Sequence, residues 1–85
     1  PLEDKLRAFN WNVINANGHD LQEIYDALKA ARENVGFPTA IVFETHKGMG
    51  VSFMKDQAGW HGKPPNDEEA AASLKEIAEA VYPWT

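Results

Sequence analysis

Residues 11–45, WNVINANGHDLQEIYDALKAARENVGFPTAIVFET, decide the fold, because they hold two short apolar runs with an amphipathic stretch between them. The first run, residues 11–16, is compatible with a short strand and leads into the turn signal Asn17 and Gly18. The second run, residues 39–45, is continuously apolar at its centre, which is typical of a strand that is covered on both faces. Together they predict a right-handed βαβ unit with parallel strands.

The amphipathic stretch between the two runs carries clear signals for the start and the end of a helix. Asp20 is a preferred N-cap residue, and Glu23 three positions later predicts a capping-box pair. Gly36 suits the left-handed conformation that follows a helix, and Pro38 cannot continue one. The apolar positions have the spacing of a single buried stripe, which comprises Leu21, Ile24, Tyr25, Leu28 and Ala31.

Helices are expected at both ends of the chain. Residues 2–9 have apolar positions on one helical face, and Asn66 with Glu69 predicts a capping box that begins a last helix. Residues 46–65 hold four glycines and two prolines without sustained periodicity, which indicates a long loop. The apolar side of the last helix is predicted to contain Ala70, Leu74, Ile77, Ala78 and Val81.

A two-stranded sheet with flanking helices leaves both sheet edges open and its apolar faces only partly covered. A loop of about 20 residues is also unusual in a small domain unless it is functional or packs on something else. We therefore expect an α/β chain with a partial doubly wound parallel sheet. Residues 1–85 would form the end of a larger doubly wound α/β domain, or one piece of a split domain, without a complete second domain.

Composition narrows the classes of function. The 85 residues are 44% hydrophobic and 25% charged, which is typical of a globular chain. A net charge of −5 argues against a general nucleic-acid binder, and no apolar run approaches the ~20 residues that span a bilayer. The absence of cysteine excludes a thiolate zinc site and a disulfide framework. It fits a reducing compartment, and we expect a cytoplasmic location.

The long loop is locally basic on an acidic chain, since residues 44–63 hold three lysines against two carboxylates. Such a segment is where an anionic ligand is expected, although a solvated loop is the plainer interpretation. Residues 46–50, HKGMG, directly follow the second strand, and their glycines let the backbone approach a ligand. Lys47 can supply a charge to phosphate, but the spacing matches neither the dinucleotide fingerprint nor the P-loop.

Residues 60–65, WHGKPP, form a second group in this loop. His61 lies among aromatic and proline residues and can act as an acid, a base or an anion ligand, although a histidine beside tryptophan is more often structural. Residues 17–20 are explained by a turn and a helix cap, and the acidic residues 67–69 by the helix dipole. No spacing indicates a metal site or a Ser-His-Asp or Cys-His nucleophile. The residues alone predict part of a phosphate-ligand site, completed by other segments.

Four segments occur in a specific order and spacing: AFNWNV at residues 8–13, GHD at 18–20, THKGMGVSFM at 45–54 and WHGKP at 60–64. Each segment is weak by itself, but the ordered set covers nearly the whole chain. It resembles the final portion of the N-terminal, diphosphate-binding domain of transketolase.

The resemblance implies a thiamine diphosphate-dependent transferase that moves a two-carbon ketol unit from a ketose phosphate to an aldose phosphate. It implies that Lys47 and His61 bind the cofactor and that His61 is also catalytic. It further implies magnesium, whose ligands are expected from other polypeptide. The remaining diphosphate- and pyrimidine-binding segments would be the partners of this chain in a dimeric assembly, and the chain alone is expected to be inactive.

Two departures and two alternatives accompany this resemblance. Asn10 stands where the family often has glycine, and Met49 stands where a basic residue is common. One alternative is a related thiamine diphosphate enzyme, such as a dihydroxyacetone or deoxyxylulose phosphate synthase, over which the WHG sequence at residues 60–62 favours transketolase. The other alternative is a non-catalytic interaction module that binds a partner through its open sheet edge.

Overall fold

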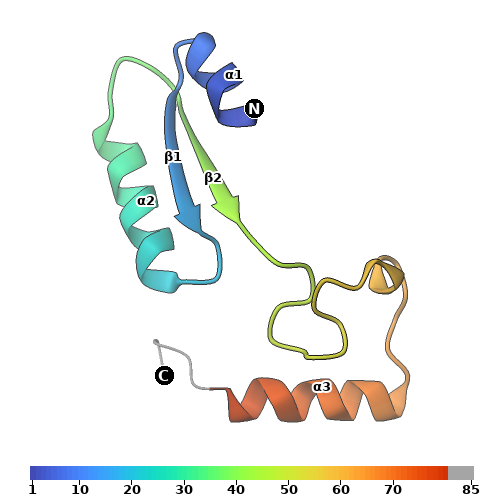
Figure 1. Cartoon of the computed structure of the whole chain (residues 1–85). Helices are drawn as coiled ribbons and strands as arrows, with labels where there is room; N and C mark the ends of the chain where they lie inside the picture. Colours follow the sequence, from blue (N-terminus) through green and yellow to red (C-terminus); the bar gives the residue numbers. More distant parts are fainter. Residues whose placement is uncertain (81–85) are drawn as a thin grey trace. The chain divides into compact units, whose positions relative to one another are not determined.

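The computed structural model describes residues 1–80 and divides into two compact units, Pro1–Thr45 and a second unit that starts at His46. The α/β class predicted from the sequence is confirmed. Within the described residues, no helix has both the length and the apolar character needed to cross a membrane. The elements follow one another in the order α1 (Leu2–Ala8), β1 (Asn12–Asn17), α2 (Leu21–Glu33), β2 (Thr39–Glu44), the short 3₁₀ helix η1 (Ala58–Trp60) and α3 (Asp67–Glu79) (Figure 1).

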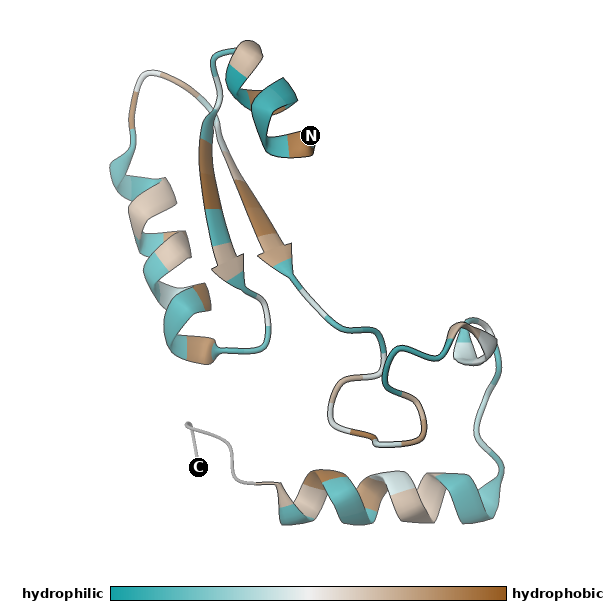
Figure 2. Ribbon diagram, viewed as in Figure 1, coloured by the Kyte–Doolittle hydropathy of each residue, from teal (hydrophilic) through white to brown (hydrophobic). Residues whose placement is uncertain are grey.

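The first unit contains the predicted βαβ arrangement. β1 and β2 pair in parallel, from Asn12 opposite Thr39 to Asn17 opposite Glu44, and α2 connects the two strands. In the described chain the sheet has only these two strands, so each strand has one open edge. Figure 2 shows that hydrophobic residues are concentrated in the middle of both strands, whereas α2 alternates between polar and apolar positions.

The sheet is only partly covered, as expected for two strands, and coverage falls short of what the apolar run of residues 39–45 indicates. Ala16 of β1 and Ala27 of α2 are the buried residues of this unit, and both are small. Phe43 pairs in register with Ala16 and is 37% exposed, because one helix does not span the width of both strands. On the opposite face, Asn15 Nδ2 donates to Glu3 Oε1 at 3.0 Å. The prediction that residues 39–45 form a strand covered on both faces is therefore wrong for the described chain.

The start of α2 follows the predicted cap but not the predicted capping box. Asp20 Oδ1 accepts hydrogen bonds from the Gln22 N–H at 2.9 Å and the Glu23 N–H at 3.2 Å. The Glu23 carboxylate accepts from the Asn17 N–H at 3.2 Å instead of from Asp20, which links the end of β1 to the first turn of the helix. Gly36 has the left-handed conformation expected after the helix, with φ of +100°.

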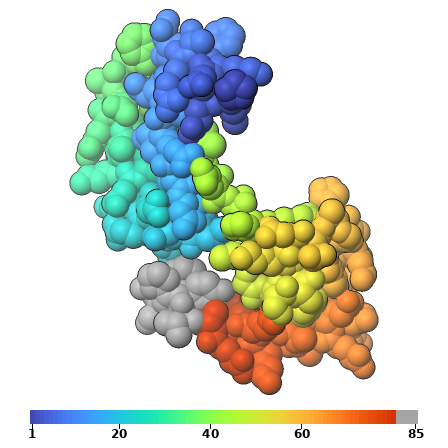
Figure 3. All heavy atoms as spheres, in the orientation of Figure 1, coloured from blue at the N-terminus to red at the C-terminus, as the bar shows by residue number. Residues whose placement is uncertain are grey.

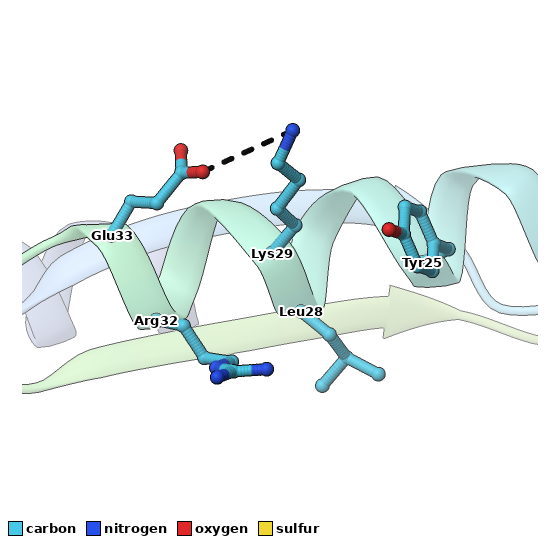
Figure 4. Close-up of a pocket in the computed structure, with 5 residues that line it drawn as sticks. All are labelled: Tyr25, Leu28, Lys29, Arg32 and Glu33. Carbon is cyan, nitrogen blue, oxygen red and sulfur yellow. Dashed lines mark ion pairs between the residues drawn. The ribbon is translucent and has the colours of Figure 1, made fainter.

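The buried stripe predicted for α2 is only partly buried. Ile24 and Ala31 are half-buried, whereas Leu21, Tyr25 and Leu28 are exposed. The physical reason is again the narrow sheet, which covers a smaller part of the helix surface than the apolar stripe occupies. An open pocket lies on the surface of α2 (Figure 4). Leu28 and Arg32 point away from the helix in one direction, and the ion pair of Lys29 and Glu33 lies in the other. This pocket is lined by Tyr25, Leu28, Lys29, Arg32 and Glu33.

In the second unit, the loop of residues 46–57 packs against α3, as the yellow and orange-to-red atoms of Figure 3 show. Val51 in this loop is buried. The Ser52 N–H donates to Glu76 Oε2 at 2.6 Å, and the Ser52 hydroxyl donates to Glu76 Oε1. These two hydrogen bonds anchor the middle of the loop to the last turns of α3.

α3 begins with the predicted capping box. The Glu69 N–H donates to Asn66 Oδ1 at 2.8 Å, and the Asn66 N–H donates to Glu69 Oε1 at 3.0 Å. The buried face of the helix differs from the prediction, since Ser73 is its buried residue. Val81 lies outside the described residues. Three other members of the predicted apolar side are exposed, namely Leu74, Ile77 and Ala78.

Gly18 connects β1 to α2 at a point where no side chain fits. A Cβ at this position would lie 2.5 Å from Thr45 Cγ2 and 3.0 Å from Phe43 Cβ. We predict that Gly18→Ala lowers the free energy of unfolding by about 1–3 kcal/mol, as overpacking commonly does. Urea denaturation followed by circular dichroism measures the change.

A second substitution distinguishes this clash from a general effect of alanine. Thr45→Ser removes Cγ2, the atom in closest contact with the added Cβ. The double variant should therefore lose less stability than the sum of the two single variants. Strict additivity of the two changes would contradict the steric explanation.

Candidate functional site

The structure brings together the two residues that the sequence singled out. Lys47 Nζ lies 3.2 Å from His61 Nδ1. An ammonium group only donates hydrogen bonds, so His61 Nδ1 must accept and the ring proton of the neutral imidazole must be on Nε2. Both side chains are exposed. The pair thus combines a cation with a ring N–H donor, a combination that suits the oxygens of an anion.

The backbone of Lys47 is fixed by Asp56, which lies at the other end of the loop. The Asp56 N–H donates to the Lys47 carbonyl at 2.8 Å. The Asp56 carboxylate lies 3.1 Å from Nδ1 of His46, the residue before Lys47. Residues 46–56 therefore form a closed loop of the size of a small Ω-loop, with its two ends side by side.

Gly48 is required where this loop closes. Its φ is +70°, and a Cβ would lie 2.5 Å from the carbonyl oxygen of Met54. The two backbone segments approach so closely that only glycine fits, in a conformation that other residues rarely adopt. Besides the approach of a ligand that the sequence pattern suggests, this glycine allows close contact within the loop itself.

Aromatic and charged contacts hold the segment that carries His61. The Trp60 ring packs on Phe53, with ring centroids 5.7 Å apart. Lys63 Nζ lies 4.2 Å from the centroid of the Trp60 ring and 3.7 Å from Glu69 Oε2. The residues on either side of His61 are thus tied to the loop and to the first turn of α3.

The hydrogen bonds from Ser52 also change the acidity of their acceptor. The Ser52 hydroxyl and N–H lower the pKa of Glu76 below its ordinary value, because both hydrogen bonds favour the carboxylate form. Desolvation of Glu76 raises its pKa and opposes the shift only in part. The anchor of the loop is therefore a charged acceptor that weakens in acid.

The remaining candidate residues have structural roles. The His19 N–H donates to Asn17 Oδ1 at 2.9 Å, and Asp20 caps α2, as the turn-and-cap interpretation predicts. Within residues 1–80, no group of three or more His, Cys, Asp or Glu side chains could hold a metal ion. Sequence reasoning missed Asp56, Ser52 and Glu76, since no local pattern marks them and their partners are distant in the sequence.

Comparison with known proteins identifies a single family. Residues 2–80 match the family described as transketolase, thiamine diphosphate binding domain. Transketolase-like protein 2 of Homo sapiens is 39% identical over 74 residues, which are 87% of this chain and 12% of that protein. The 6-deoxy-6-sulfo-D-fructose transketolase subunit of Clostridium sp. (strain MSTE9) is 38% identical over 77 residues, which are 91% of this chain and 28% of that subunit.

Transketolase of Mus musculus is 34% identical over 79 residues, which are 93% of this chain and 12% of that enzyme. The chain thus spans between 12% and 28% of the length of these relatives.

Gly48→Ala should open the closed loop. The added Cβ meets the Met54 carbonyl and the left-handed conformation is strained, which together cost about 1–3 kcal/mol. We expect the Asp56 amide to exchange roughly 5- to 150-fold faster, in hydrogen-exchange measurements by NMR. Gly59→Ala is the matched control, because an added Cβ there has nothing within 4 Å. Equal exchange rates in the two variants would contradict this role of Gly48.

Glu76→Gln should destabilise the chain in a pH-dependent manner. Folding lowers the pKa of Glu76, so its contribution to the free energy of unfolding is fully present above the pKa that Glu76 has in the unfolded chain. This contribution is lost as the pH falls through the pKa of Glu76 in the folded chain. Urea midpoints of the wild type and the variant should therefore differ at about pH 7 and converge towards about pH 2. Glu79→Gln, an exposed change on the same helix, is the control. A difference that stays constant with pH would argue against the charged anchor.

Proposed function

This chain belongs to the transketolase family, within its thiamine diphosphate binding domain, and on that premise we propose that it supplies one part of a thiamine diphosphate site. Other polypeptide completes the site. In this proposal Lys47 binds the cofactor diphosphate, and His61 binds the cofactor and the reacting substrate. The contact of 3.2 Å between Lys47 Nζ and His61 Nδ1 is the observation that carries the proposal.

The donor set of this chain fits a diphosphate. Lys47 provides a cation, and His61, with Nδ1 occupied by Lys47, provides an Nε2–H donor for an anionic oxygen. Both side chains are exposed and lie in the locally basic segment of an acidic chain. The closed loop holds the Lys47 backbone in place, so little ordering is needed when a ligand binds.

In the proposed reaction, a two-carbon ketol unit passes from a ketose phosphate to an aldose phosphate. Thiamine diphosphate, when bound, supplies the carbanion chemistry of this transfer. Lys47 neutralises phosphate charge, and the His61 Nε2–H donates to the substrate oxygen on which negative charge develops. This chain therefore contributes binding, orientation and electrostatic stabilisation.

The proposal places the rest of the enzyme in other polypeptide. Magnesium would have its ligands there, and so would the pyrimidine-binding segments. Two relatives are named as subunits, of a 6-deoxy-6-sulfo-D-fructose transketolase and of an apulose-4-phosphate transketolase from Actinobacillus succinogenes. Those names support assembly from more than one chain. We propose that the assembly is dimeric and that it is located in the cytoplasm.

A second candidate function is that of an interaction module without a catalytic role. The exposed apolar residues of α2 and α3 favour docking onto further polypeptide, and Leu74 is 67% exposed. If the chain acts only by docking, alanine at Lys47 or His61 should leave the activity of the assembly intact.

Titration with inorganic pyrophosphate tests the binding role directly. Lys47→Ala and His61→Ala should each weaken binding about 10- to 100-fold, the effect expected from losing one charge-assisted hydrogen bond. Isothermal titration calorimetry of the full chain measures the affinity. Lys55→Ala is the control, because it removes an exposed lysine from the same loop. An equal loss in all three variants would indicate only general charge attraction.

The catalytic role of His61 is tested in the enzyme assembled with its remaining segments. His61→Ala should lower turnover on the order of 10²-fold, which is typical of removing one positioned donor. A steady-state assay of ketol transfer measures kcat. Unchanged turnover would remove His61 from the catalytic residues and favour the interaction module.

A further inference from the structure

We propose that Asp56 is a positioning residue, which holds Lys47 so that its ammonium group meets the His61 ring. The identity of the ligand that this pair binds rests on the proposed function. The positioning of Lys47 is a property of this chain alone. Asp56 does not contact either Nζ of Lys47 or the His61 ring in the hydrogen bonds described above. It acts at the base of Lys47, where its N–H holds the Lys47 carbonyl and its carboxylate holds the side chain of the preceding His46.

Asp56 holds two consecutive residues with two different groups. Its N–H donates to the Lys47 carbonyl at 2.8 Å, and its carboxylate oxygens lie 3.1 and 3.3 Å from His46 Nδ1. A carboxylate only accepts hydrogen bonds, so the proton must be on Nδ1 of His46. Because both contacts come from one residue, Asp56 holds the His46 side chain and the Lys47 backbone together.

The backbone conformation of Asp56 makes this double contact specific. Its φ is +58°, in the left-handed region where aspartate and asparagine are enriched among residues other than glycine. Most other residues would be strained there, and asparagine and glycine, which tolerate the conformation, lack the carboxylate. The position therefore needs both an unusual conformation and an acceptor side chain.

The other contacts of the loop do not replace this one. Ser52 anchors the middle of the loop, and not its closed base at Lys47, to Glu76 of α3. The close approach of Gly48 to Met54 restricts the path of the chain but forms no hydrogen bond to Lys47. Loss of the Asp56 carboxylate should therefore loosen the Lys47 end of the loop, while the anchor to α3 is kept.

The tautomer of His61 reports on this positioning without any ligand. With Lys47 donating to Nδ1, the neutral ring should carry its proton on Nε2, and the ¹⁵N chemical shifts of its two nitrogens should be widely separated. Asp56→Gly keeps the N–H and the left-handed conformation but removes the carboxylate that holds His46, so these shifts should move towards those of a free imidazole. Asp56→Asn keeps the conformation and an oxygen acceptor, so its shifts should lie between those of the wild type and Asp56→Gly.

Two controls exclude trivial causes of such a shift. Glu68→Gln removes one exposed carboxylate from the same unit and should leave the His61 shifts unchanged. The amide resonances of α3 should stay dispersed in every variant, and if Asp56→Gly does not fold, the intermediate shift in Asp56→Asn decides the test. His61 shifts that equal those of the wild type in both Asp56 variants, or that move as much in Glu68→Gln, would overturn the proposal.

Pyrophosphate titration of the same variants separates this inference from the proposed function. Asp56→Gly should weaken pyrophosphate binding by about 5- to 10-fold, with Asp56→Asn in between, because Lys47 is retained but less ordered. A wild-type chain that shows the His61 tautomer effect but binds no pyrophosphate would confirm the positioning and contradict the proposed function. Tight binding in the wild type with no tautomer effect in the Asp56 variants would leave the function intact and overturn the role of Asp56.

Discussion

The hydrogen bond from the Asp56 N–H to the Lys47 carbonyl is the contact on which the candidate site depends. A loop without helix or strand has no ladder of hydrogen bonds, while ordering each residue costs about 1–2 kcal/mol of conformational entropy. A few specific contacts must offset that cost in this loop. They are the closure at Asp56, the close approach at Gly48, the buried side chain of Val51 and the anchor between Ser52 and Glu76.

A second constraint comes from the small amount of buried apolar surface. The buried hydrophobic residues of the described chain are Ala16, Ala27 and Val51, which all have small side chains. Larger apolar residues on α2 and α3 are exposed, and the two-stranded sheet has two open edges. Sheets of two strands are marginally stable by themselves. In the proposed assembly, other polypeptide covers these surfaces and presents the remaining part of the cofactor site.

The features predicted well from the sequence are those set by local interactions. The caps at Asp20 and Asn66 and the left-handed glycine at position 36 depend on residues close in the chain. The two parallel strands pair at long range, but each strand is marked by its own apolar run and the helix between them makes the pairing parallel. Asn10 illustrates the same principle, because its φ of +65° is a conformation that asparagine tolerates where the family often has glycine. Which side of a helix is buried depends instead on what lies beside it, and for α2 and α3 that prediction was partly wrong.

The candidate site shows the same division. Lys47 and His61 stand in short patterns that a sequence displays, so both were identified, and the structure places them in contact. Asp56, Ser52 and Glu76 act through partners 9 to 24 positions away, across a loop whose path no periodicity predicts. Met49, which stands where a basic residue is common in the family, is 48% exposed and brings no charge to this loop.

Native mass spectrometry, of material purified under gentle conditions from the cells that make this chain, tests most directly whether it shares a cofactor site with other polypeptide. The measurement is made with and without thiamine diphosphate and magnesium. We predict an assembly that is larger than the 9.5 kDa chain and that retains the cofactor. A lone 9.5 kDa species that retains no cofactor under either condition would contradict the proposed role of this chain.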